Sequence, residues 1–420
     1  IDDGSTDDSR SIIEEYTNHP SIKIIFQQNH GLNVTNNIAL RVSNGKYIIR
    51  LDADDYFHPK ALELLSAAME NDPELGLIFP DYYLIDAEGS ITEEFKRHDF
   101  DSAVSLPDQA AHGACTMIRT EFLKNLGGYN ESFSCQDGYD IWIKFIAHHK
   151  ISNINEPLFY YRRHGNNLTR NETKILSTRA KINKLHSHNR FGRLDTVCII
   201  PVRDESLALK QLRNKKILDY KIQEARQSKH ICKIIISSPS DIIGDYINDK
   251  YGSFDSIIFH KRDEKYARLN VNLIETVESI LATKELSHLN FKAIILLTIE
   301  FPFIKSYVID DAVNTLFLFN SDSLLSVRQE NTVFYQHYGN GMHPILNQDK
   351  FTRLEREAIY RVTGGISVVR SEVFEKSKQI VYGQIGHIMM DEVSSLGIFS
   401  DFDFMIAESF VKRVTTLSST

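Results

Sequence analysis

An apolar segment that runs straight into a cluster of acids constrains the fold of this chain more than any other feature. Residues 45–51 have the composition of a buried strand, and Asp52, Asp54 and Asp55 follow almost directly. In α/β folds, ligand sites lie at the carboxyl ends of strands, where such acids leave the sheet. Two carboxylates at this spacing can share a hard divalent cation. The acids could equally cap the helix expected over residues 60–70, so this segment alone leaves both roles open.

Short apolar segments alternate with helical patterns along the chain. In the first half the strand-like segments are residues 22–26, 47–51 and 75–82, and the helical patterns are residues 35–43 and 60–71. A second series begins at residue 196, with strand-like segments at residues 233–237, 293–297 and 323–327. Such alternation is typical of parallel sheets covered by helices. We therefore predict an α/β fold with two nucleotide-binding-type domains, residues 1–193 and 194–420, each built on a mostly parallel central sheet.

Composition excludes several classes of protein. The chain has 420 residues, 42% of them hydrophobic and 25% charged, which is ordinary for a globular protein. Its net charge of -8 argues against a nucleic-acid partner, and no apolar run approaches the roughly 18 residues of a transmembrane helix. The four cysteines lack metal-ligand spacing and indicate a reducing compartment. We predict a cytoplasmic protein. Peripheral association with membrane-bound machinery at the inner membrane face, and assembly into a homo-oligomer, both stay open.

Five segments, in this order along the chain, resemble family-2 glycosyltransferases of the GT-A fold. They are residues 1–7, 29–31, 51–55, 127–131 and 136–142, and the resemblance covers roughly residues 1–170. It implies a metal-dependent enzyme that moves a sugar from a nucleotide-sugar donor to a glycan or lipid-linked acceptor. Members of this family can invert the anomeric carbon by direct displacement, and the resemblance implies the same here. The expected setting is the biosynthesis of cell-surface polysaccharide.

The resemblance implies donor-binding roles for several polar residues. Asp2 or Asp3 would accept hydrogen bonds from the base and ribose of the donor, since a carboxylate at a strand end suits those donors. Asn37 matches an asparagine of the family pattern that contacts the donor. Asp54, with Asp52 beside it, would hold Mg²⁺ or Mn²⁺ on the diphosphate, and the metal would stabilise the departing nucleoside diphosphate as a Lewis acid.

The resemblance also implies a general base. Asp137 matches the residue that takes a proton from the acceptor hydroxyl, although it could also cap the helix that starts near Tyr139, and the two roles are compatible. Gln136 stands where the family usually has an acid. His164 lies where some related enzymes carry a histidine that faces the metal or phosphate, but a loop or surface histidine is an alternative reading.

The beginning of the chain bears on the expected activity. Residues 1–3 read as the last residues of a strand. We therefore expect a fragment of a longer protein whose GT-A domain lacks its first strand. On this expectation, the longer parent transfers sugar and the fragment does not.

The second half resembles the acylneuraminate cytidylyltransferase family, which activates sialic-acid-like sugars with CTP. The matching framework comprises residues 199–203, 216–220, 234–238, 261–262, 293–297, 363–366 and 403–404. These segments are mostly strands and their edges, so they indicate the fold more than the activity. The resemblance would place Arg203, Lys216 and Arg262 at a nucleotide site.

The active-site positions of that family are altered here. Asp204 and Glu205 follow Arg203, where the family has a glycine-rich turn that cradles the triphosphate. Residues 298–304 lack the family's arginine, and residues 396–399 lack its two metal-binding carboxylates. We interpret the second domain as a degenerate, non-catalytic relative. Two alternatives stay open: an active nucleotidyltransferase for a sialic-acid-like sugar, or a chain that is entirely a non-catalytic sugar- or nucleotide-binding scaffold.

Overall fold

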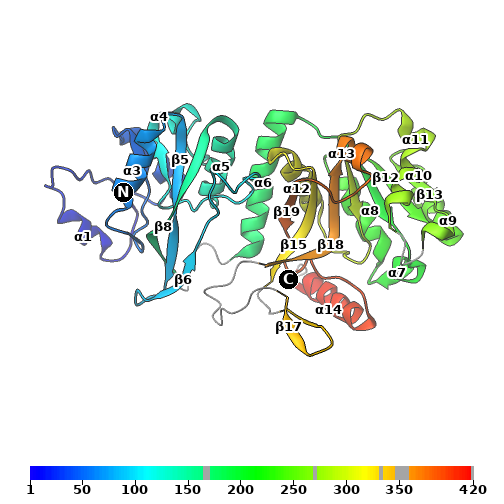
Figure 1. Cartoon of the computed structure of the whole chain (residues 1–420). Coiled ribbons are helices and arrows are strands. Elements are labelled where there is room, and N and C mark those ends of the chain that lie inside the picture. The colour runs from blue at the N-terminus through cyan, green and yellow to red at the C-terminus, as the bar shows by residue number, and fades with distance from the viewer. Residues whose placement is uncertain (164–170, 268–271, 331–333, 346–358, 418–420) are drawn as a thin grey trace. The chain divides into compact units, whose positions relative to one another are not determined.

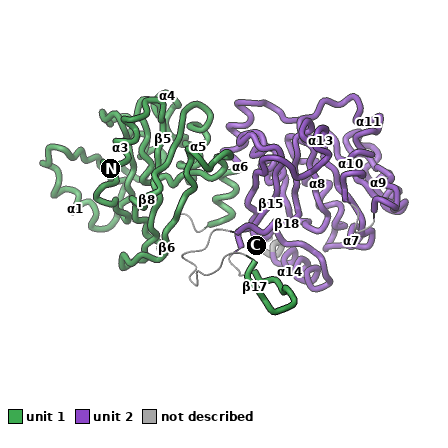
Figure 2. The backbone as a smooth tube through the Cα atoms, viewed as in Figure 1, with its two compact units in different colours: residues 1–179, 334–357 green, residues 180–333, 358–420 purple. Residues whose placement is uncertain are grey.

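The computed structural model describes residues 1–163, 171–267, 272–330, 334–345 and 359–417, with side chains as far as residue 413. The chain forms two compact units (Figure 2). Unit 1 comprises residues 1–179 and 334–357, and unit 2 comprises residues 180–333 and 358–420. Helix α6 (Glu172–Phe191) contributes residues to both units. The predicted domain boundary at residues 193 and 194 stays a prediction.

Unit 1 contains a six-stranded sheet (Figure 1). Its order is β3 (Tyr47–Ile49), β7 (Met117–Arg119), β5 (Leu75–Ile85), β8 (Lys150–Arg162) and β4 (Tyr56–Phe57), and β6 (Ile91–Phe95) also pairs with β5. Two further short strands, β1 (Asp2–Asp3) and β2 (Phe26–Gln27), form a parallel pair of their own. The helices are α1 (Ser9–Glu14), α2 (Leu32–Val42), α3 (Ala61–Asn71), α4 (Thr120–Asn125) and α5 (Asp137–His148).

The predicted α/β class is confirmed, but the sheet of unit 1 is mixed rather than mostly parallel. Only β5 and β8 pair in parallel, whereas β3–β7, β5–β7, β5–β6 and β4–β8 are antiparallel. Parallel neighbours need a long crossover, usually a helix. β6 instead returns directly from β5 across a turn at residues 86–90, and no helix lies between β6 and β7.

Helix α3 covers this sheet with one apolar face. Ala61, Leu65 and Met69 are spaced four residues apart and are fully buried. They pack in one cluster with Ile78 of β5 and Leu158 of β8. This spacing places the three side chains on one side of a helix, as the sequence pattern predicts.

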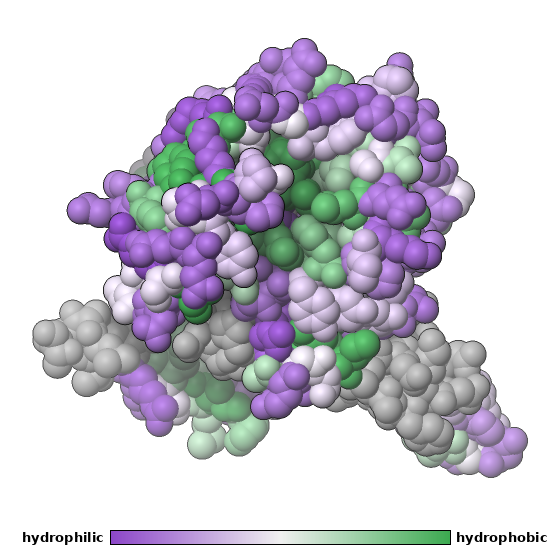
Figure 3. All heavy atoms as spheres, turned by 90° about the vertical axis from the view of Figure 1, so that its left-hand side faces the viewer, coloured by the Kyte–Doolittle hydropathy of each residue, from purple (hydrophilic) through white to green (hydrophobic). Residues whose placement is uncertain are grey.

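One face of unit 1 has a hollow in which apolar side chains gather among polar ones (Figure 3). Several large apolar side chains of this unit are more than two-fifths exposed: Ile1, Ile12, Ile22, Leu51 and Leu62. Contiguous apolar surface in a hollow is typical of a face that binds a ligand or another polypeptide segment, whereas apolar side chains exposed singly are ordinary.

Unit 2 contains a seven-stranded sheet that is mostly parallel. Its order is β13 (Ile257–Lys261), β12 (Ile231–Ser238), β9 (Thr196–Pro201), β14 (Ala293–Leu297), β18 (Ile359–Arg370), β15 (Ser323–Glu330) and β19 (Ile385–Met389). β18 alone runs antiparallel to both of its neighbours. Two short hairpins accompany the sheets: β10 (Gln211–Leu212) with β11 (Lys215–Lys216) in unit 2, and β16 (Tyr335–His337) with β17 (Met342–Pro344) in unit 1. The other helices of unit 2 are α7 (Glu205–Leu209), α8 (Ile217–Gln227), α9 (Asp241–Tyr251), α10 (Ile274–Leu281), α11 (Lys284–Ser287), α12 (Ser306–Leu318), α13 (Ser371–Ser377) and α14 (Asp401–Leu417).

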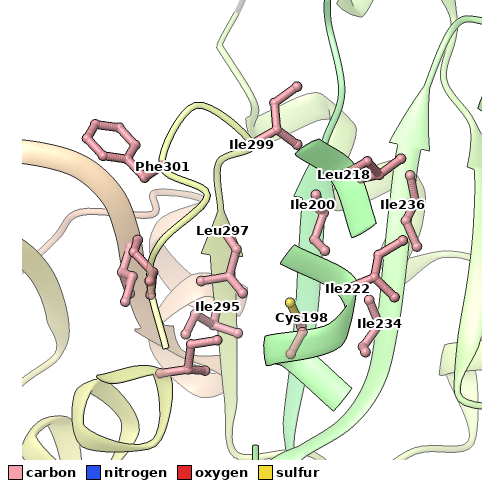
Figure 4. Packing of buried hydrophobic residues seen from close by; sticks show 14 of the residues in the cluster. Cys198, Ile200, Leu218, Ile222, Ile234, Ile236, Ile295, Leu297, Ile299 and Phe301 are labelled. Atoms are coloured by element: carbon pink, nitrogen blue, oxygen red, sulfur yellow. The ribbon is translucent and has the colours of Figure 1, made fainter. Parts of the chain in front are cut away.

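The central strand β9 of unit 2 is apolar on both faces because helices cover both. Cys198 and Ile200 point to one side, where they meet Ile222 of α8 (Figure 4). Val197 and Ile199 belong to a second buried cluster on the other side. A continuous apolar run, rather than an alternating one, is the pattern expected of such a strand. No helix in the described parts of the chain has both the length and the apolar composition needed to span a bilayer.

A single lysine interrupts the core of unit 2. Lys221 lies on α8 and is completely buried, and its ammonium has no hydrogen-bond partner among the described residues. Burial lowers the pKa of Lys221 to about 7, because a charged group is costly to desolvate. Between its ordinary pKa of 10.5 and about 7, the unfolded chain binds a proton that the folded chain does not. Stability therefore falls as the pH falls through that interval.

We expect Lys221→Met to stabilise unit 2. At pH 7 the free energy of unfolding should rise by about 4 kcal/mol, since a pKa shift of one unit corresponds to about 1.4 kcal/mol. At pH 10 the gain should be only about 1 kcal/mol, because that pH is within about half a unit of the unfolded lysine's pKa of 10.5 and keeping the side chain neutral then costs little. Thermal and urea unfolding at both pH values measure the difference, with the exposed Lys229→Met as control. An equal gain at both pH values would show that packing, not charge, is responsible.

Candidate active site

An arginine joins two of the predicted site residues. Arg50 directly follows β3, and its Nη1 donates a hydrogen bond to Oδ2 of Asp137, 87 residues away at the first position of α5. The Nε of Arg50 lies 2.9 Å from Oδ1 of Asp52. The structure therefore brings the predicted metal-site carboxylate and the predicted base to one cation, with Asp137 and Arg50 largely buried.

The backbone around this ion pair is held in unusual conformations. Cys115 and Gln136 adopt left-handed backbone angles, with φ of 56° and 64°. The Cys115 amide donates to the Arg50 carbonyl at 2.9 Å, and Gln136 immediately precedes Asp137. Left-handed conformations at non-glycine residues cost on the order of 1 kcal/mol and are concentrated at functional sites. They turn both segments toward Arg50.

Small residues are needed beside the ion pair. A Cβ at Gly113 would lie 3.0 Å from Nη2 of Arg50 and 3.2 Å from Oδ2 of Asp137. A Cβ at Gly138 would lie 2.9 Å from the Cα of Gly113. A side chain at Gly113 would require Arg50 or Asp137 to move, and one at Gly138 would press on the backbone of Gly113.

A small cleft of unit 1 lies beside the ion pair. Its lining includes His112, Gly113, Tyr129, Asp137, Gly138 and Trp142. Burial lowers the pKa of His112 to about 4, with a further contribution from Arg50, and raises the pKa of Tyr129 to about 12, with a further contribution from Asp137. Both rings are therefore neutral at pH 7. Asp137 is the only carboxylate among the described residues that line the cleft.

Arg162 of β8 fixes the acidic loop from the other side. Its backbone amide donates to Oδ1 of Asp55 at 2.8 Å, and its Nε donates to the carbonyl of Asp54 at 2.9 Å. Its Nη1 also donates to the carbonyls of Asp86 and Ala87. One side chain thus ties the loop that carries Asp52 and Asp54 to the turn after β5.

Asp55, Arg50 and Arg162 take part in the site although the sequence did not single them out. Burial raises the pKa of Asp55 to about 7, and the charges of Asp54 and Asp52 act in the same direction. Its Oδ2 has no hydrogen-bond partner among the described residues. Two features of the sequence could have indicated these residues: an arginine at the end of an apolar strand, and a third acid after the predicted pair.

The predicted donor-binding acids Asp2 and Asp3 hold the chain's own backbone. Oδ1 of Asp2 accepts a hydrogen bond from the Ser5 amide at 3.0 Å. Asp3 accepts hydrogen bonds from the side chain of Gln27 and from the amides of His30 and Gly31. Burial alone would raise the pKa of Asp3, but these hydrogen bonds outweigh it and the pKa is lowered. Contact of either acid with a nucleotide stays a prediction.

Asn37 is engaged in a similar way. Its Nδ2 donates to the Tyr129 carbonyl at 2.9 Å and to Oε1 of Glu131 at 2.7 Å, and its Oδ1 accepts from the Tyr129 amide at 2.9 Å. Its amide therefore anchors the segment that brings Tyr129 to the cleft. Gly128 makes room for this contact, since a Cβ there would lie 2.6 Å from Oδ1 of Asn37.

The structure describes two of the three predicted metal ligands. Asp52 and Asp54 lie on the same loop, and His164 lies outside the described residues. Within the described ranges, no three histidine, cysteine, aspartate or glutamate side chains are grouped to hold a metal. Mg²⁺ commonly binds one or two protein carboxylates and takes its other ligands from substrate phosphates and water. Asp52 and Asp54 are the acids that such a cation would use, and burial, with a contribution from the charge of Asp54, raises the pKa of Asp52.

The residues predicted for a nucleotide site in unit 2 do not all come together. Arg262 is 1% exposed, and its Nη2 donates to the Val202 carbonyl at 2.7 Å. Burial, with the nearby charge of Arg203, lowers the pKa of Arg262 to about 10. Lys216 instead lies over the ring of Tyr246, with its ammonium 3.7 Å from the ring centroid.

The altered positions of unit 2 have structural roles. Asp204 caps α7 by accepting a hydrogen bond from the Leu207 amide at 3.0 Å, and Glu205 accepts one from the Ser240 hydroxyl. The ring of Phe399 packs edge-on against Phe301, with centroids 5.6 Å apart. Aromatic packing therefore occupies the segment where the sequence resemblance would place metal-binding acids.

Comparison with known proteins supports the reading of unit 1. Residues 1–127 match the family model described as Glycosyl transferase family 2. The matched residues include Asp2, Asp3, Asn37, Asp52 and Asp54, and they end before the predicted base.

Several curated relatives are glycosyltransferases. The chain is 32% identical over 167 residues to a chondroitin synthase of Escherichia coli, which covers 40% of this chain and 24% of the relative. It is 33% identical over 170 residues to an uncharacterized glycosyltransferase of Methanocaldococcus jannaschii, covering 39% and 58%. A hyaluronan synthase of Pasteurella multocida is 29% identical over 172 residues, covering 39% and 17%. The chain thus spans 58% or less of the length of these relatives.

Two solved structures resemble the chain at low scores. The 4-diphosphocytidyl-2C-methyl-D-erythritol synthase of Anaerococcus prevotii has a TM-score of 0.37 and 13% identity, and covers 52% of this chain and 96% of its own. TarS of S. aureus has a TM-score of 0.36 and 18% identity, covering 45% and 33%. Likeness at this level says nothing about activity.

We expect Asn37→Ala to loosen the segment around Tyr129. The substitution removes three hydrogen bonds, so the free energy required to open this segment locally should fall by about 2 kcal/mol. Hydrogen exchange at the Tyr129 amide, which loses its acceptor, measures the effect. Asn125→Ala, at an exposed position on α4, is the control and should leave that exchange unchanged. Unchanged protection in Asn37→Ala would contradict the anchoring role.

Proposed function

We propose that unit 1 is the catalytic part of a metal-dependent glycosyltransferase that moves a sugar from a nucleotide-sugar donor to a glycan or lipid-linked acceptor in polysaccharide biosynthesis. The observation that carries this proposal is the convergence of Asp52 and Asp137 on Arg50 beside a cleft. The family match over residues 1–127 and the synthases among the relatives support the same class of reaction.

Asp137 acts as the general base in this proposal. Its carboxylate lines the cleft, where an acceptor hydroxyl would bind and give up its proton as its oxygen attacks the anomeric carbon. The bond between that carbon and the donor diphosphate breaks, and the configuration inverts. His112, with its pKa lowered to about 4, is a poor base, and Tyr129, with its pKa raised to about 12, is a poor acid.

Asp54 and Asp52 would hold Mg²⁺ or Mn²⁺. When bound, the metal supplies positive charge that stabilises the nucleoside diphosphate as it leaves. Arg162 keeps the loop of these acids in place through the Asp54 carbonyl and the Asp55 carboxylate. Asp2, Asp3 and Asn37 contribute to the donor site mainly by holding the backbone around it.

We expect Asp137→Asn and Asp54→Asn to fail at different steps. Asp137→Asn should lower turnover by about 10² to 10⁴ while donor affinity is kept, because only proton transfer is lost. Asp54→Asn should weaken donor binding that depends on Mn²⁺. Donor binding and transfer are measured across UDP-, GDP- and dTDP-sugars, in the longest protein that the gene encodes.

Glu63→Gln, which removes one exposed carboxylate on α3, is the charge-matched control for both variants. It should keep wild-type turnover. An Asp54→Asn enzyme with full Mn²⁺-dependent donor binding would exclude the metal assignment. An Asp137→Asn enzyme with more than a tenth of wild-type turnover would exclude the proposed base.

A second candidate function is anion binding in unit 2, favoured by the state of Arg262. Its Nε and Nη1 have no hydrogen-bond partner among the described residues, although the side chain is buried. A buried cation without a counter-ion is costly. The phosphate of a nucleotide, or the carboxylate of a sialic-acid-like sugar, would supply the missing acceptors. This binding would not require the chemistry of a nucleotidyltransferase.

We expect CTP to raise the melting temperature of unit 2 and Arg262→Met to abolish most of that rise. Affinity for CTP should fall at least tenfold, because charge-assisted hydrogen bonds are lost. Arg226→Met, an exposed substitution on α8, is the control. Absence of a thermal shift with any nucleoside triphosphate would contradict the site. Release of pyrophosphate in the presence of a sialic-acid-like sugar would instead show an active nucleotidyltransferase.

A further inference from the structure

The guanidinium of Arg50 forms ion pairs with two carboxylates that have different proposed roles, Asp52 and Asp137. The side chains of Arg50, Asp52 and Asp137 are 17%, 33% and 11% exposed, so water can neutralise their charges only partly. Among the described residues, no lysine forms an ion pair with Asp52 or Asp137. Arg50 is therefore the counter-ion on which both acids depend.

The two contacts of Arg50 differ in quality. Its Nη1 donates a true hydrogen bond to Asp137. Toward Asp52, Nε lies 2.9 Å from Oδ1 but makes no aligned hydrogen bond, and the contact from Nη2 to Oδ2 is long at 3.4 Å. Hydrogen bonds weaken steeply when they are long or misaligned. Asp52 is thus the more easily exchanged partner, and it is also the more exposed carboxylate.

We propose that Arg50 is an internal counter-ion which Asp52 gives up when a divalent cation binds, while Arg50 stays on Asp137 and positions it. This inference rests on the proposed function. Arg50 contacts neither donor nor acceptor in it and acts through Asp137, so it is a positioning residue. Its guanidinium opposes metal binding in the donor-free protein and holds the base in the loaded protein.

In this proposal the charge of Arg50 affects both metal binding at Asp52 and proton transfer at Asp137. A guanidinium beside Asp52 repels a second cation at the same carboxylate, so removal of the guanidinium should tighten metal binding. The same removal leaves Asp137 without its hydrogen-bond donor and should slow transfer. A merely structural arginine would not produce opposite changes in metal affinity and turnover.

The test measures Mn²⁺ affinity of the full chain by electron paramagnetic resonance, without donor or acceptor. Arg50→Gln should bind Mn²⁺ three- to tenfold more tightly than wild type. Arg50→Lys should tighten binding less, because a compact ammonium keeps the charge but cannot bridge two carboxylates as a guanidinium fork does. Lys46→Gln removes one exposed cation just before the same strand and should change the affinity less than twofold.

The transfer assay gives the second measurement. Arg50→Gln should lower kcat at least tenfold with an unchanged or lower KM for the donor, and Arg50→Lys should recover part of kcat. Circular dichroism establishes whether each variant folds. If Arg50→Gln does not fold, Arg50→Lys carries the test through its tighter Mn²⁺ binding.

The outcomes separate this inference from the function on which it rests. Wild type that binds Mn²⁺ through Asp54, together with Arg50 variants that bind it no more tightly, overturns the inference alone. Absence of Mn²⁺ binding in wild type and in every Arg50 variant overturns the metal assignment and the inference together. Binding by Arg50→Gln but not by wild type supports both.

Discussion

The ion pairs of Arg50 are the interaction on which the site of unit 1 depends. A largely buried guanidinium is tolerated only with partners, and two carboxylates from distant segments supply them. The need to pair this guanidinium explains the conformation of the backbone around it. Gly113 and Gly138 allow the backbone to come close, and the left-handed Cys115 and Gln136 turn their segments toward the arginine.

The sequence predicted the main elements of the fold well where a local pattern was strong. The apolar face of α3 and the strand β5 lie where their periodicity placed them, and the α/β class follows from their alternation. The mixed sheet of unit 1 was not predictable in this way. Strand direction is set by whether a connection is a helical crossover or a turn, and residues 86–116 carry no periodic signal that distinguishes the two.

The candidate site was predictable only in part for a similar reason. Asp52, Asp54 and Asp137 stand in recognisable local motifs, so the sequence singled them out. Arg50 pairs with a residue 87 positions away, and Arg162 binds an aspartate 107 positions away. Such contacts depend on how the sheet brings strands together, and a single sequence does not record them. The same holds for Asn37, whose anchoring of Tyr129 spans 92 positions.

The buried arginine of unit 1 is paired with carboxylates, whereas the buried Arg262 of unit 2 keeps donors that are unpaired among the described residues. This difference affects the chemistry that each unit can perform. In unit 1 the buried cation Arg50 is paired with Asp52 and Asp137, and preorganised charges of this kind are what a catalytic site requires. In unit 2 Asp204 caps α7, Glu205 accepts a hydrogen bond from Ser240, and Phe301 packs against Phe399 at the position where the family that the sequence resembles would carry metal ligands. A buried guanidinium with unmatched donors favours an anion, and the altered positions lack the carboxylates that would hold a metal for nucleotidyl transfer.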